Sequence, residues 1–240
     1  MEVSVVIPNF NGIAFLDSVL ASLEGQTLKN FEVIFVDNGS SDGSCSFVAG
    51  NYPWVHIIEL PENFGFCGAV NAGIRAAKAP YVLLLNNDTE VKEDFVEEML
   101  AAIRRHKNAF SCGARMVQYH DRDKLDDVGN YYCALGWSFA RGRGKDIHAY
   151  ETEDRIFSAC AGAAIYRKKI LEKIGYFDEE HFAYLEDTDI GYRARIYGYE
   201  NWYAPKAIVY HVGSGTSGSR YNQFKTRYSS RNNIYLIYKN

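Results

Sequence analysis

The sequence predicts an α/β fold in which a doubly wound, mixed sheet carries helices on both faces. The main observation is a fourfold alternation of apolar, β-branched runs with helical patterns in residues 1–108, joined by short connections. The second is bulk composition. With 240 residues, 47% of them apolar and 23% charged, the chain can bury the core of one large domain.

The N-terminal elements follow one another in a regular order. Val3–Ile7 is a continuous apolar run of the kind that forms a buried parallel strand. Ile13, Leu16, Leu20 and Leu23 then mark one face of a helix that Gly25 can end. The remaining expected elements are strands Phe31–Val36, Trp54–Ile58 and Tyr81–Leu85, a short helix after residue 44, and helices over about 67–78 and 92–106.

The pattern loosens after Ala109. Residues 120–155 show no clear period and predict a long, partly mobile insert, typical of a loop on the acceptor side. Order returns over 156–166, followed by helices at 168–174 and about 186–197 and a strand at Ala207–His211. We therefore expect one domain over 1–215, with a nucleotide-binding half (1–108) and an acceptor-binding half (109–215). A Gly/Ser segment over 213–219 leads into a helical extension over 216–240, and its apolar ending suggests that the natural chain continues.

Composition argues against several classes of protein. A net charge of -4 does not suit a protein that binds nucleic acid, whose phosphates favour an excess of Lys and Arg. The five cysteines lack the spacing of a zinc site and are expected to be reduced thiols. No apolar run approaches the roughly 20 residues of a spanning helix, and a strand begins almost at once. These features predict a cytoplasmic protein.

Polar residues follow the predicted strands. Pro8-Asn9-Phe10-Asn11-Gly12 follows the first strand, Asp37 to Ser44 the second, Glu62 to Gly68 the third, and Asn86-Asn87-Asp88 the fourth. Ligands of doubly wound sheets bind beyond the carboxyl ends of strands, so these side chains are expected at one rim. Each loop alone could be an ordinary turn, but turn chemistry does not explain a carboxylate at the ends of two apolar strands. No Gly-x-Gly-x-x-Gly or Walker loop is present, which argues against nicotinamide or flavin binding.

The rim residues suggest how a nucleotide would bind. Asp37 is placed to accept a hydrogen bond from a base or ribose, and Gly39 lets the backbone turn closely around a ligand. Asn63 and Gly65 precede a helix whose first amides favour a phosphate. Asp88 is the expected ligand of Mg²⁺ or Mn²⁺, because such ions use one or two carboxylates together with substrate phosphates.

A second acidic cluster, Glu186-Asp187-Thr188-Asp189, begins a predicted helix. It could simply complement the helix dipole. The functional interpretation makes Asp187 a base that takes a proton from an acceptor hydroxyl. Glu186 would then orient the acceptor or raise the proton affinity of its neighbour, and Asp189 would face outward or cap the helix. His211 ends an apolar strand; a lone histidine is more often structural, but this position favours a metal contact.

Taken in order, these motifs resemble those of family 2 glycosyltransferases with the GT-A fold, a Rossmann-like architecture. Val5 to Asn11 resembles the opening strand and turn, and Val36 to Ser44 the nucleotide-binding loop. Asn63 to Gly73 is similar to a segment of members close to rhamnosyl- and galactofuranosyltransferases. Asn86-Asn87-Asp88 stands where the family usually has Asp-x-Asp, and Glu186-Asp187 resembles its Glu-Asp motif.

The resemblance implies a role for each matching residue. Asp187 would be the catalytic base beside Glu186, and Asp88 and His211 would hold the divalent metal. The implied residues of the donor pocket are Pro8, Asn9, Asn11, Asp37, Gly39, Asn63, Gly65, Asn71 and Asn87.

The resulting hypothesis is an inverting glycosyltransferase that uses a nucleotide sugar, such as dTDP-rhamnose or a UDP-sugar. The acceptor would be a saccharide or a lipid-linked saccharide in the synthesis of cell-surface polysaccharide or glycolipid. One alternative is a nucleotidyltransferase, although Pro8 to Gly12 has no basic residue to grip a triphosphate. Another is a non-catalytic carbohydrate-binding domain of the same fold. The aromatic and basic stretch Tyr221–Lys239 is expected either to pack on the domain or to contact the inner face of the membrane peripherally.

Overall fold

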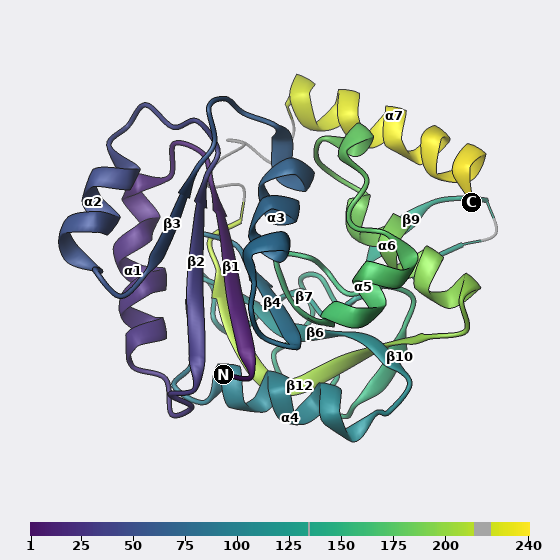
Figure 1. The fold of residues 1–240 in the computed structure, drawn as a ribbon. Coiled ribbons are helices and arrows are strands. Elements are labelled where there is room, and N and C mark those ends of the chain that lie inside the picture. Colours follow the sequence, from purple (N-terminus) through teal and green to yellow (C-terminus); the bar gives the residue numbers. More distant parts are fainter. Residues whose placement is uncertain (134, 214–221) are drawn as a thin grey trace.

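A ten-stranded mixed sheet forms the centre of the protein in the computed structural model, which describes residues 1–133, 135–213 and 222–240. Helices cover both faces of this sheet (Figure 1). The predicted α/β fold with a doubly wound mixed sheet is confirmed.

The strand order of the main sheet is β10-β12-β6-β11-β4-β1-β2-β3, with β5 paired to β12 and β7 paired to β6. A separate two-stranded hairpin consists of β8 and β9. The strands are β1 (Val3–Asn9), β2 (Phe31–Asp37), β3 (His56–Glu59), β4 (Tyr81–Leu85), β5 (Thr89–Val91), β6 (Ala109–Gln118), β7 (Leu125–Asp127), β8 (Asn130–Tyr132), β9 (Ser138–Ala140), β10 (Asp154–Ile156), β11 (Ala163–Arg167) and β12 (Glu200–His211).

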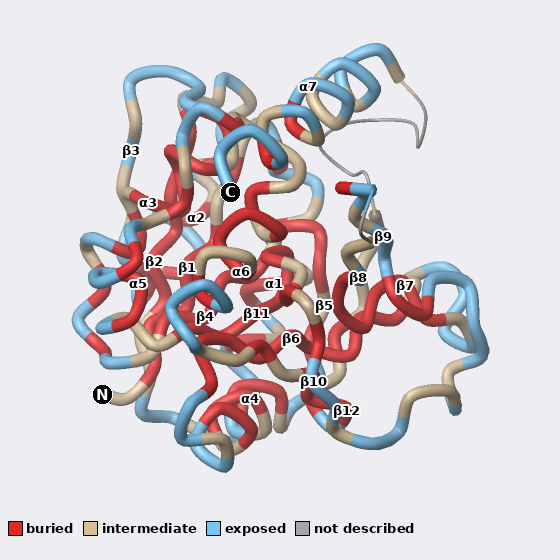
Figure 2. Tube along the Cα trace, turned by 90° about the vertical axis from the view of Figure 1, so that its right-hand side faces the viewer, coloured by how far each residue is buried: buried red, intermediate tan, exposed pale blue. Residues whose placement is uncertain are grey.

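Strand β1 shows how the sequence builds two cores. Successive side chains of a strand point to opposite faces, so Val5 and Ile7 pack on one side while Val6 packs on the other. The first core takes side chains from α1 (Ile13–Glu24), α2 (Ser44–Asn51) and α4 (Phe95–Arg105). The second takes them from α3 (Gly65–Ala76), α5 (Lys168–Ile174) and α6 (Glu186–Ile196). Figure 2 shows the buried residues concentrated in the central sheet and on the inward sides of these helices.

Several predicted elements differ from those observed. Strand β6 was not predicted, because it is buried on both faces and its small residues, such as Ser111 and Gly113, hide any period. Strand β12 begins at Glu200, well before the predicted start at Ala207, and its pairing with β6 shifts register between Ala204 and Ile208. Pro205 lies within this irregular stretch and lacks the backbone N–H that a regular ladder needs. The insert over 120–155 contains β7, β8 and β9.

Parallel and antiparallel pairing meet at the middle of the sheet. Strands β1, β2, β3 and β4 run parallel, whereas β11 pairs antiparallel with both β4 and β6. The sheet therefore continues across residue 108, where we predict the division into two halves. That division stays a prediction, and the predicted Gly/Ser segment lies outside the described residues beyond Gly213.

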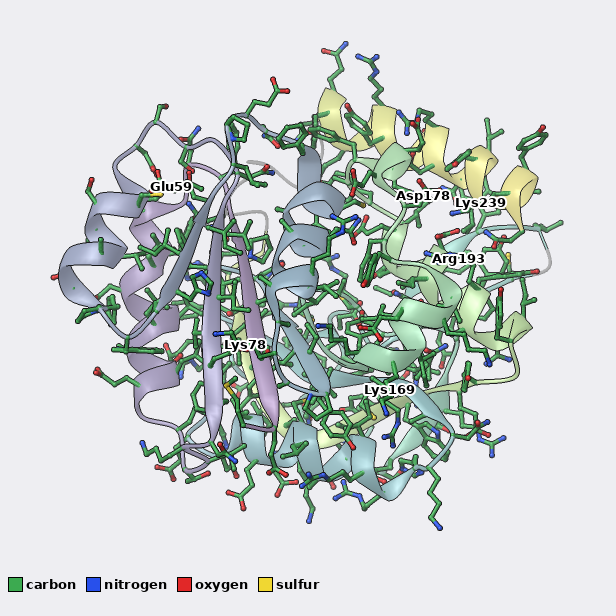
Figure 3. All side chains as sticks on the ribbon, in the orientation of Figure 1. Glu59, Lys78, Lys169, Asp178, Arg193 and Lys239 are labelled. Carbon is green, nitrogen blue, oxygen red and sulfur yellow. The ribbon has the colours of Figure 1, made fainter. Side chains whose placement is uncertain are left out.

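The last helix, α7 (Gln223–Lys239), packs beside the segment that leads into α6 (Figure 1). Leu236 and Asn232 on its inner side are fully buried. Asp178 and Lys239 point toward one another near the end of this helix (Figure 3), with Lys239 Nζ 2.5 Å from Asp178 Oδ2. Among the described residues, no helix is both long and apolar enough to span a bilayer.

Candidate active site

A cavity of about 1200 Å³ opens where β1 and β4 end. It is lined by residues far apart in the sequence, including the segments that begin α6 and α7. The predicted site residues along its wall are Pro8, Asn9, Asn63, Gly65, Asn87, Asp88, Glu186, Asp187 and His211. The structure therefore brings the rim of the first half together with the acidic cluster of the second half.

A chain of side-chain hydrogen bonds joins the ends of three strands. Asn9 Nδ2 donates to Asp37 Oδ1 at 3.0 Å, and Asn87 Nδ2 donates to Asn9 Oδ1 at 2.7 Å. A Cβ atom on Gly12 would lie 2.1 Å from Asn87 Nδ2 and 2.5 Å from Asn9 Oδ1, so only glycine leaves room for this chain. Asp37 is not in the cavity wall, but its neighbour Asn38 is. Asp37 therefore fixes the side chain of Asn9 from outside the cavity wall.

Three other predicted donor residues lie outside the cavity wall. Asn11 Oδ1 accepts a hydrogen bond from the amide of Ser41, which ties the first loop to the second. Gly39 has a φ of 77°, and a Cβ there would come within 2.8 Å of the Glu62 backbone. Asn71 is fully engaged further down α3, where its side chain donates to the carbonyl of Phe177 and accepts from the amide of the same residue. Its observed contacts join α3 to the 177–179 segment.

The start of α3 is less open to phosphate than predicted. Asn63 Oδ1 accepts from the amide of Gly65 at 2.9 Å, and Asn38 Oδ1 accepts from the amide of Phe64 at 3.0 Å. The amide of Cys67 donates to the carbonyl of Phe182. The expectation that these helix-start amides are offered to a ligand is wrong for Phe64, Gly65 and Cys67, because protein acceptors already use them.

His211 lies between two carboxylates. Its Nδ1 is 2.7 Å from Asp126 Oδ2, and its Nε2 is 3.3 Å from Asp88 Oδ1. Burial lowers the pKa of His211, but the contacts with Asp126 and Asp88 outweigh burial and raise this pKa to about 10. Within the part of the chain that the structure describes, Nε2 is buried and makes no hydrogen bond of good geometry.

This arrangement fits a divalent cation, although no group of three or more acidic, His or Cys side chains arranged to hold a metal is found among the described residues. A buried imidazole nitrogen without a hydrogen bond lies beside the Asp88 carboxylate, while the other nitrogen is held by Asp126. Histidine ligands of metals usually have their second nitrogen bonded to a carboxylate in this way. Mg²⁺ and Mn²⁺ sites with only one or two protein ligands are completed by substrate phosphates and water.

Glu186 and Asp187 occupy the first turn of α6 and differ in their surroundings. Asp187 Oδ1 accepts from the amide of Thr188 at 2.6 Å, and its Oδ2 accepts from Asn130 Nδ2 at 3.2 Å. Glu186 Oε2 is buried without a hydrogen-bond partner among the described residues. Burial, and then the charge of Asp187, raises the pKa of Glu186. Burial also raises the pKa of Asp187, but the bonds from Asn130 and Thr188 oppose that rise. Glu186 is therefore the member of the pair that keeps a proton more readily.

Asp189, two residues further along α6, neither faces outward nor caps the helix as expected. It is fully buried and pairs with Arg193 Nε at 2.9 Å and with Lys239 Nζ at 3.1 Å. Its role is to join α6 to α7.

Sequence reasoning missed Asp126, Asp127, Asn130 and Arg143, which come from the insert. Asp126, Asp127 and Arg143 line the cavity, and Asn130 binds Asp187 from β8. The only signal in the sequence was the adjacent pair of acids within the aperiodic stretch. Nothing in that stretch indicated that its residues would lie in one cavity with the residues at the ends of β1 and β4.

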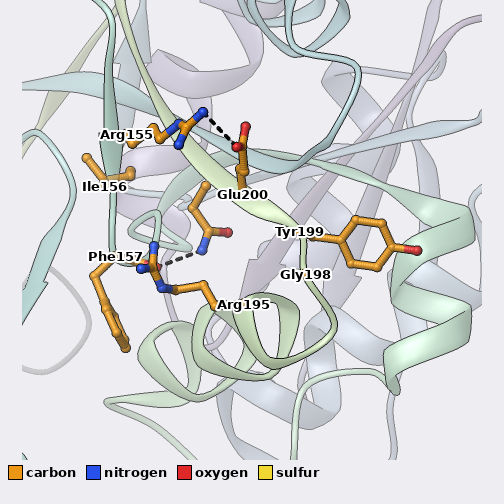
Figure 4. Close-up of a pocket in the computed structure, with 8 residues that line it drawn as sticks. Arg155, Ile156, Phe157, Arg195, Gly198, Tyr199 and Glu200 are labelled. Carbon is orange, nitrogen blue, oxygen red and sulfur yellow. Dashed lines mark hydrogen bonds and ion pairs between the residues drawn. The ribbon is translucent and has the colours of Figure 1, made fainter.

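A smaller cavity of about 460 Å³ lies near the start of β12 (Figure 4). Its polar groups already bind one another: Arg155 Nη2 is 2.9 Å from Glu200 Oε1, and Asn201 Nδ2 donates to the carbonyl of Phe157. None of the predicted site residues lines it. The larger cavity is therefore the candidate active site.

Comparison with known proteins agrees with this geometry. The model of the family described as glycosyl transferase family 2 matches residues 4–175. The chain belongs to this family. Its fold is the GT-A fold, as in the solved glycosyltransferases that it resembles, and the matched residues include the rim of the cavity from Pro8 to Asp88.

Relatives in the family include an N-acetylglucosaminyl-diphospho-decaprenol L-rhamnosyltransferase of Mycobacterium tuberculosis. It is 25% identical over 89% of this chain and 77% of the relative. An uncharacterized protein of Sinorhizobium fredii, y4gI, is 25% identical over 90% of this chain, but the chain spans only 25% of that protein. An uncharacterized glycosyltransferase of Bacillus subtilis, YwdF, is 29% identical over 81% of this chain and 68% of the relative.

Solved structures share the fold at lower identity. GalNAc-T7, crystallised with UDP, GalNAc and Mn²⁺, superposes with a TM-score of 0.78 at 14% identity, covering 99% of this chain and 48% of that protein. S. aureus TarS superposes with a TM-score of 0.66 at 21% identity, covering 89% of this chain and 37% of TarS. The chain therefore spans less than half of either protein.

Proposed function

We propose that this member of the family is an inverting glycosyltransferase that moves a sugar from a nucleoside diphosphate to an acceptor hydroxyl. The observation that carries the proposal is that Asp88 and Asp187, 99 positions apart in the sequence, line one cavity with the amide side chains of Asn9 and Asn87. Such a reaction needs a group that stabilises the charge on the leaving diphosphate and a base that takes the proton of the acceptor hydroxyl.

Asp187 acts as the base in this mechanism. With the shared proton on Glu186, Asp187 is the ionised partner, and its raised pKa makes it a better proton acceptor. Asn130 and Thr188 fix the two oxygens of this carboxylate. The acceptor oxygen loses its proton to Asp187 and attacks the anomeric carbon as the bond to the diphosphate oxygen breaks. One displacement from the opposite face inverts the anomeric centre.

Asp88 and His211 are the residues that would hold Mg²⁺ or Mn²⁺. A bound divalent ion would neutralise charge on the departing diphosphate. Asp126 fixes the His211 ring through Nδ1, so that Nε2 stays directed toward Asp88. On the other side of Asp88, Asn87 is held by Asn9.

We propose a saccharide or lipid-linked saccharide as the acceptor, and dTDP-rhamnose or a UDP-sugar as the donor. The named activity of the M. tuberculosis relative, transfer of L-rhamnose to a diphospho-decaprenol sugar, supports this class of substrates. Family membership argues against a nucleotidyltransferase. The pairing of Asp88 with His211 and of Asp187 with Asn130 argues against a domain that has kept the fold without the chemistry.

We also propose peripheral contact with the inner face of a membrane through α7. Ile234, Ile237 and Tyr238 share one face of the helix and are exposed. A Cβ on Gly136 would lie 2.3 Å from Ile237 Cδ1, so the β8–β9 hairpin, with exposed Leu135 and Trp137, meets the same face. An exposed apolar face of this kind suits contact with a lipid-linked acceptor.

Replacing the proposed base tests the function. Asp187→Asn is expected to lower kcat by at least about 10³-fold, because the amide cannot take the acceptor proton. Affinity for UDP and dTDP, measured by calorimetry, should stay within about twofold. Turnover is measured with a panel of UDP-, dTDP- and GDP-sugars, and Asp121→Asn, at an exposed position, serves as the matched control. Near-normal turnover of the Asp187 variant would remove this residue from its role.

Removal of divalent ions tests the metal assignment. EDTA is expected to suppress transfer by more than about tenfold, and Mg²⁺ or Mn²⁺ should restore it. Isothermal titration with Mn²⁺ in the presence of UDP should show a site that is lost in His211→Ala. Full transfer in the presence of chelator contradicts the assignment.

A further inference from the structure

We propose that Asn232 of α7 is a positioning residue for the Glu186–Asp187 pair. The inference rests on the proposed transferase function and adds a residue outside the cavity to its machinery. Asn232 does not line the cavity, yet it is fully buried and contacts the turn that leads into α6.

The side chain of Asn232 binds three backbone carbonyls of this turn. Asn232 Nδ2 donates to the carbonyls of His181 at 2.9 Å, Ala183 at 2.9 Å and Tyr184 at 2.8 Å. An amide has only two N–H groups, so at least one of them is shared between acceptors. The His181 carbonyl also accepts from the amide of Ala183 at 2.7 Å. Loss of Asn232 would remove one donor from each of the three partly buried carbonyls, which is costly.

The backbone of the turn needs such support. Phe182, Tyr184 and Leu185 all have positive φ angles, of 61°, 71° and 68°. This conformation is rare for residues with bulky side chains, and each instance is energetically unfavourable. Such strain persists only where the surroundings hold it. Leu185 directly precedes Glu186, so the strained turn determines where α6 begins.

The turn also forms part of the active site itself. Phe182, Tyr184 and Leu185 line the cavity beside Glu186 and Asp187. If the turn relaxes, the Asp187 carboxylate moves relative to the donor residues on the opposite part of the rim. A displacement of about 1 Å can cost on the order of 10²-fold in rate.

Other contacts keep α7 in place when Asn232 is changed. Tyr235 Oη donates to Asp178 Oδ2 at 2.9 Å, and Lys239 Nζ pairs with both Asp178 and Asp189. Leu236 is fully buried. The effect of Asn232 on the turn can therefore be separated from the docking of the helix.

The experiment compares Asn232→Asp and Asn232→Ala with Asn233→Ala. Aspartate is close in size to asparagine but has lost both N–H donors, and alanine guards against misfolding caused by the new charge. Asn233 Nδ2 donates only to the Ser229 carbonyl of α7 among the described residues, so its variant is the matched control. Steady-state transfer, affinity for UDP and dTDP, and hydrogen–deuterium exchange of the full chain are measured for each.

Both Asn232 variants are expected to lose about 10²-fold in kcat, with nucleotide affinity within about twofold of wild type. Exchange should rise in residues 182–187 and stay unchanged in 233–239. Asn233→Ala should match wild type in every measurement. The inference is overturned if a folded Asn232 variant keeps wild-type kcat, or if exchange rises along all of α7 together with the loss of activity.

The two proposals fail in different ways. If the wild-type chain transfers no sugar from any donor in the panel, the transferase proposal fails, while exchange in 182–187 still tests the hold of Asn232 on the turn. If the wild type is active and the Asn232 variants are equally active, only the positioning role is lost.

Discussion

Glu186 and Asp187 are adjacent in the sequence but differ in the partners of their carboxylates. Asp187 is held by Asn130 and Thr188, whereas Glu186 Oε2 has no partner among the residues described. Glu186 is buried and Asp187 is partly buried in the cavity wall, so hydrogen bonding to Asp187 favours its ionisation first. Burial, together with hydrogen bonds made to Asp187 alone, thus keeps Glu186 protonated beside an ionised Asp187.

The raised pKa of Glu186 predicts a dependence of stability on pH. As pH rises above the ordinary range of a glutamate, the unfolded chain releases a proton that the folded chain retains, so the free energy of unfolding falls. Below that range the cost is absent. Glu186→Gln removes the titration and should be more stable than wild type by about 1–3 kcal/mol at pH 8, but by much less at pH 4.5.

Urea denaturation at the two pH values measures this difference, with exposed Glu180→Gln as the control. An equal difference at both pH values would show that Glu186 ionises as readily in the folded protein as in the unfolded one.

The sequence allowed the residues at the ends of β1 and β4 to be predicted, because parallel strands deliver their carboxyl ends to one edge. Asn9, Asn87 and Asp88 were found in this way. Asp126 and Asn130 were not, since they lie in three-residue strands, β7 and β8, that are too short to show a period. Asn71, a polar residue within the matching motif, joins α3 to the 177–179 segment, and its role in donor binding stays a prediction.

At the scale of elements, α7 is fastened by an acidic residue that precedes α6. Burial raises the pKa of Asp178, but hydrogen bonds from Lys239, Glu180 and Tyr235 outweigh burial and lower this pKa to about 2. The stabilisation is complete above the ordinary pKa of an aspartate, and is lost as pH falls from about 4 toward 2.

Asp178→Asn should therefore lower the free energy of unfolding by about 1 kcal/mol at pH 7, a value reduced for partial exposure of the pair. The difference from wild type should shrink between pH 4 and pH 3. Thermal denaturation across this range measures it, with Asp123→Asn at an exposed position as the control. A difference that stays constant down to pH 3 would mean that the ionised carboxylate does not fasten the helix.

The elements of the first half were predicted nearly in full because strands and amphipathic helices alternate there. The cavity residues of the second half were not predicted in the same way, because the strands there do not all run in the same direction. Strand β11 runs against β4, so the cavity is lined by residues that come before it, Cys160 to Gly162. The residues directly after a strand lie at the rim only where all strands run the same way. Strand β6, buried on both faces, carries no period at all.

At the scale of the whole molecule, charge is distributed unevenly. The chain carries a net charge of -4, yet α7 has no acidic residue and carries Lys225, Arg227 and Arg231 in addition to Lys239, which pairs with Asp178 and Asp189. Cations of this kind flanking an exposed apolar face favour anionic bilayers, and salt screens the attraction.

The chain is therefore expected to co-sediment with phosphatidylglycerol vesicles at low salt. The double change Trp137→Ser and Tyr238→Ser should weaken binding by at least about fivefold, because both side chains are exposed and apolar contact supplies part of the affinity. Unchanged circular dichroism of the variant controls for folding. Absence of wild-type binding to these vesicles would rule out the membrane contact.

The hydrogen-bonded side chains of Asp37, Asn9 and Asn87 affect how a ligand is received. They are already immobilised across three strand ends, so in the proposed transferase a nucleotide would not bear the entropic cost of ordering them one at a time. This part of the cavity rim is thus held in place before a ligand binds. Under the proposed function, adaptation to different sugars would then depend on the facing wall of the cavity, which the segments that begin α6 and α7 provide.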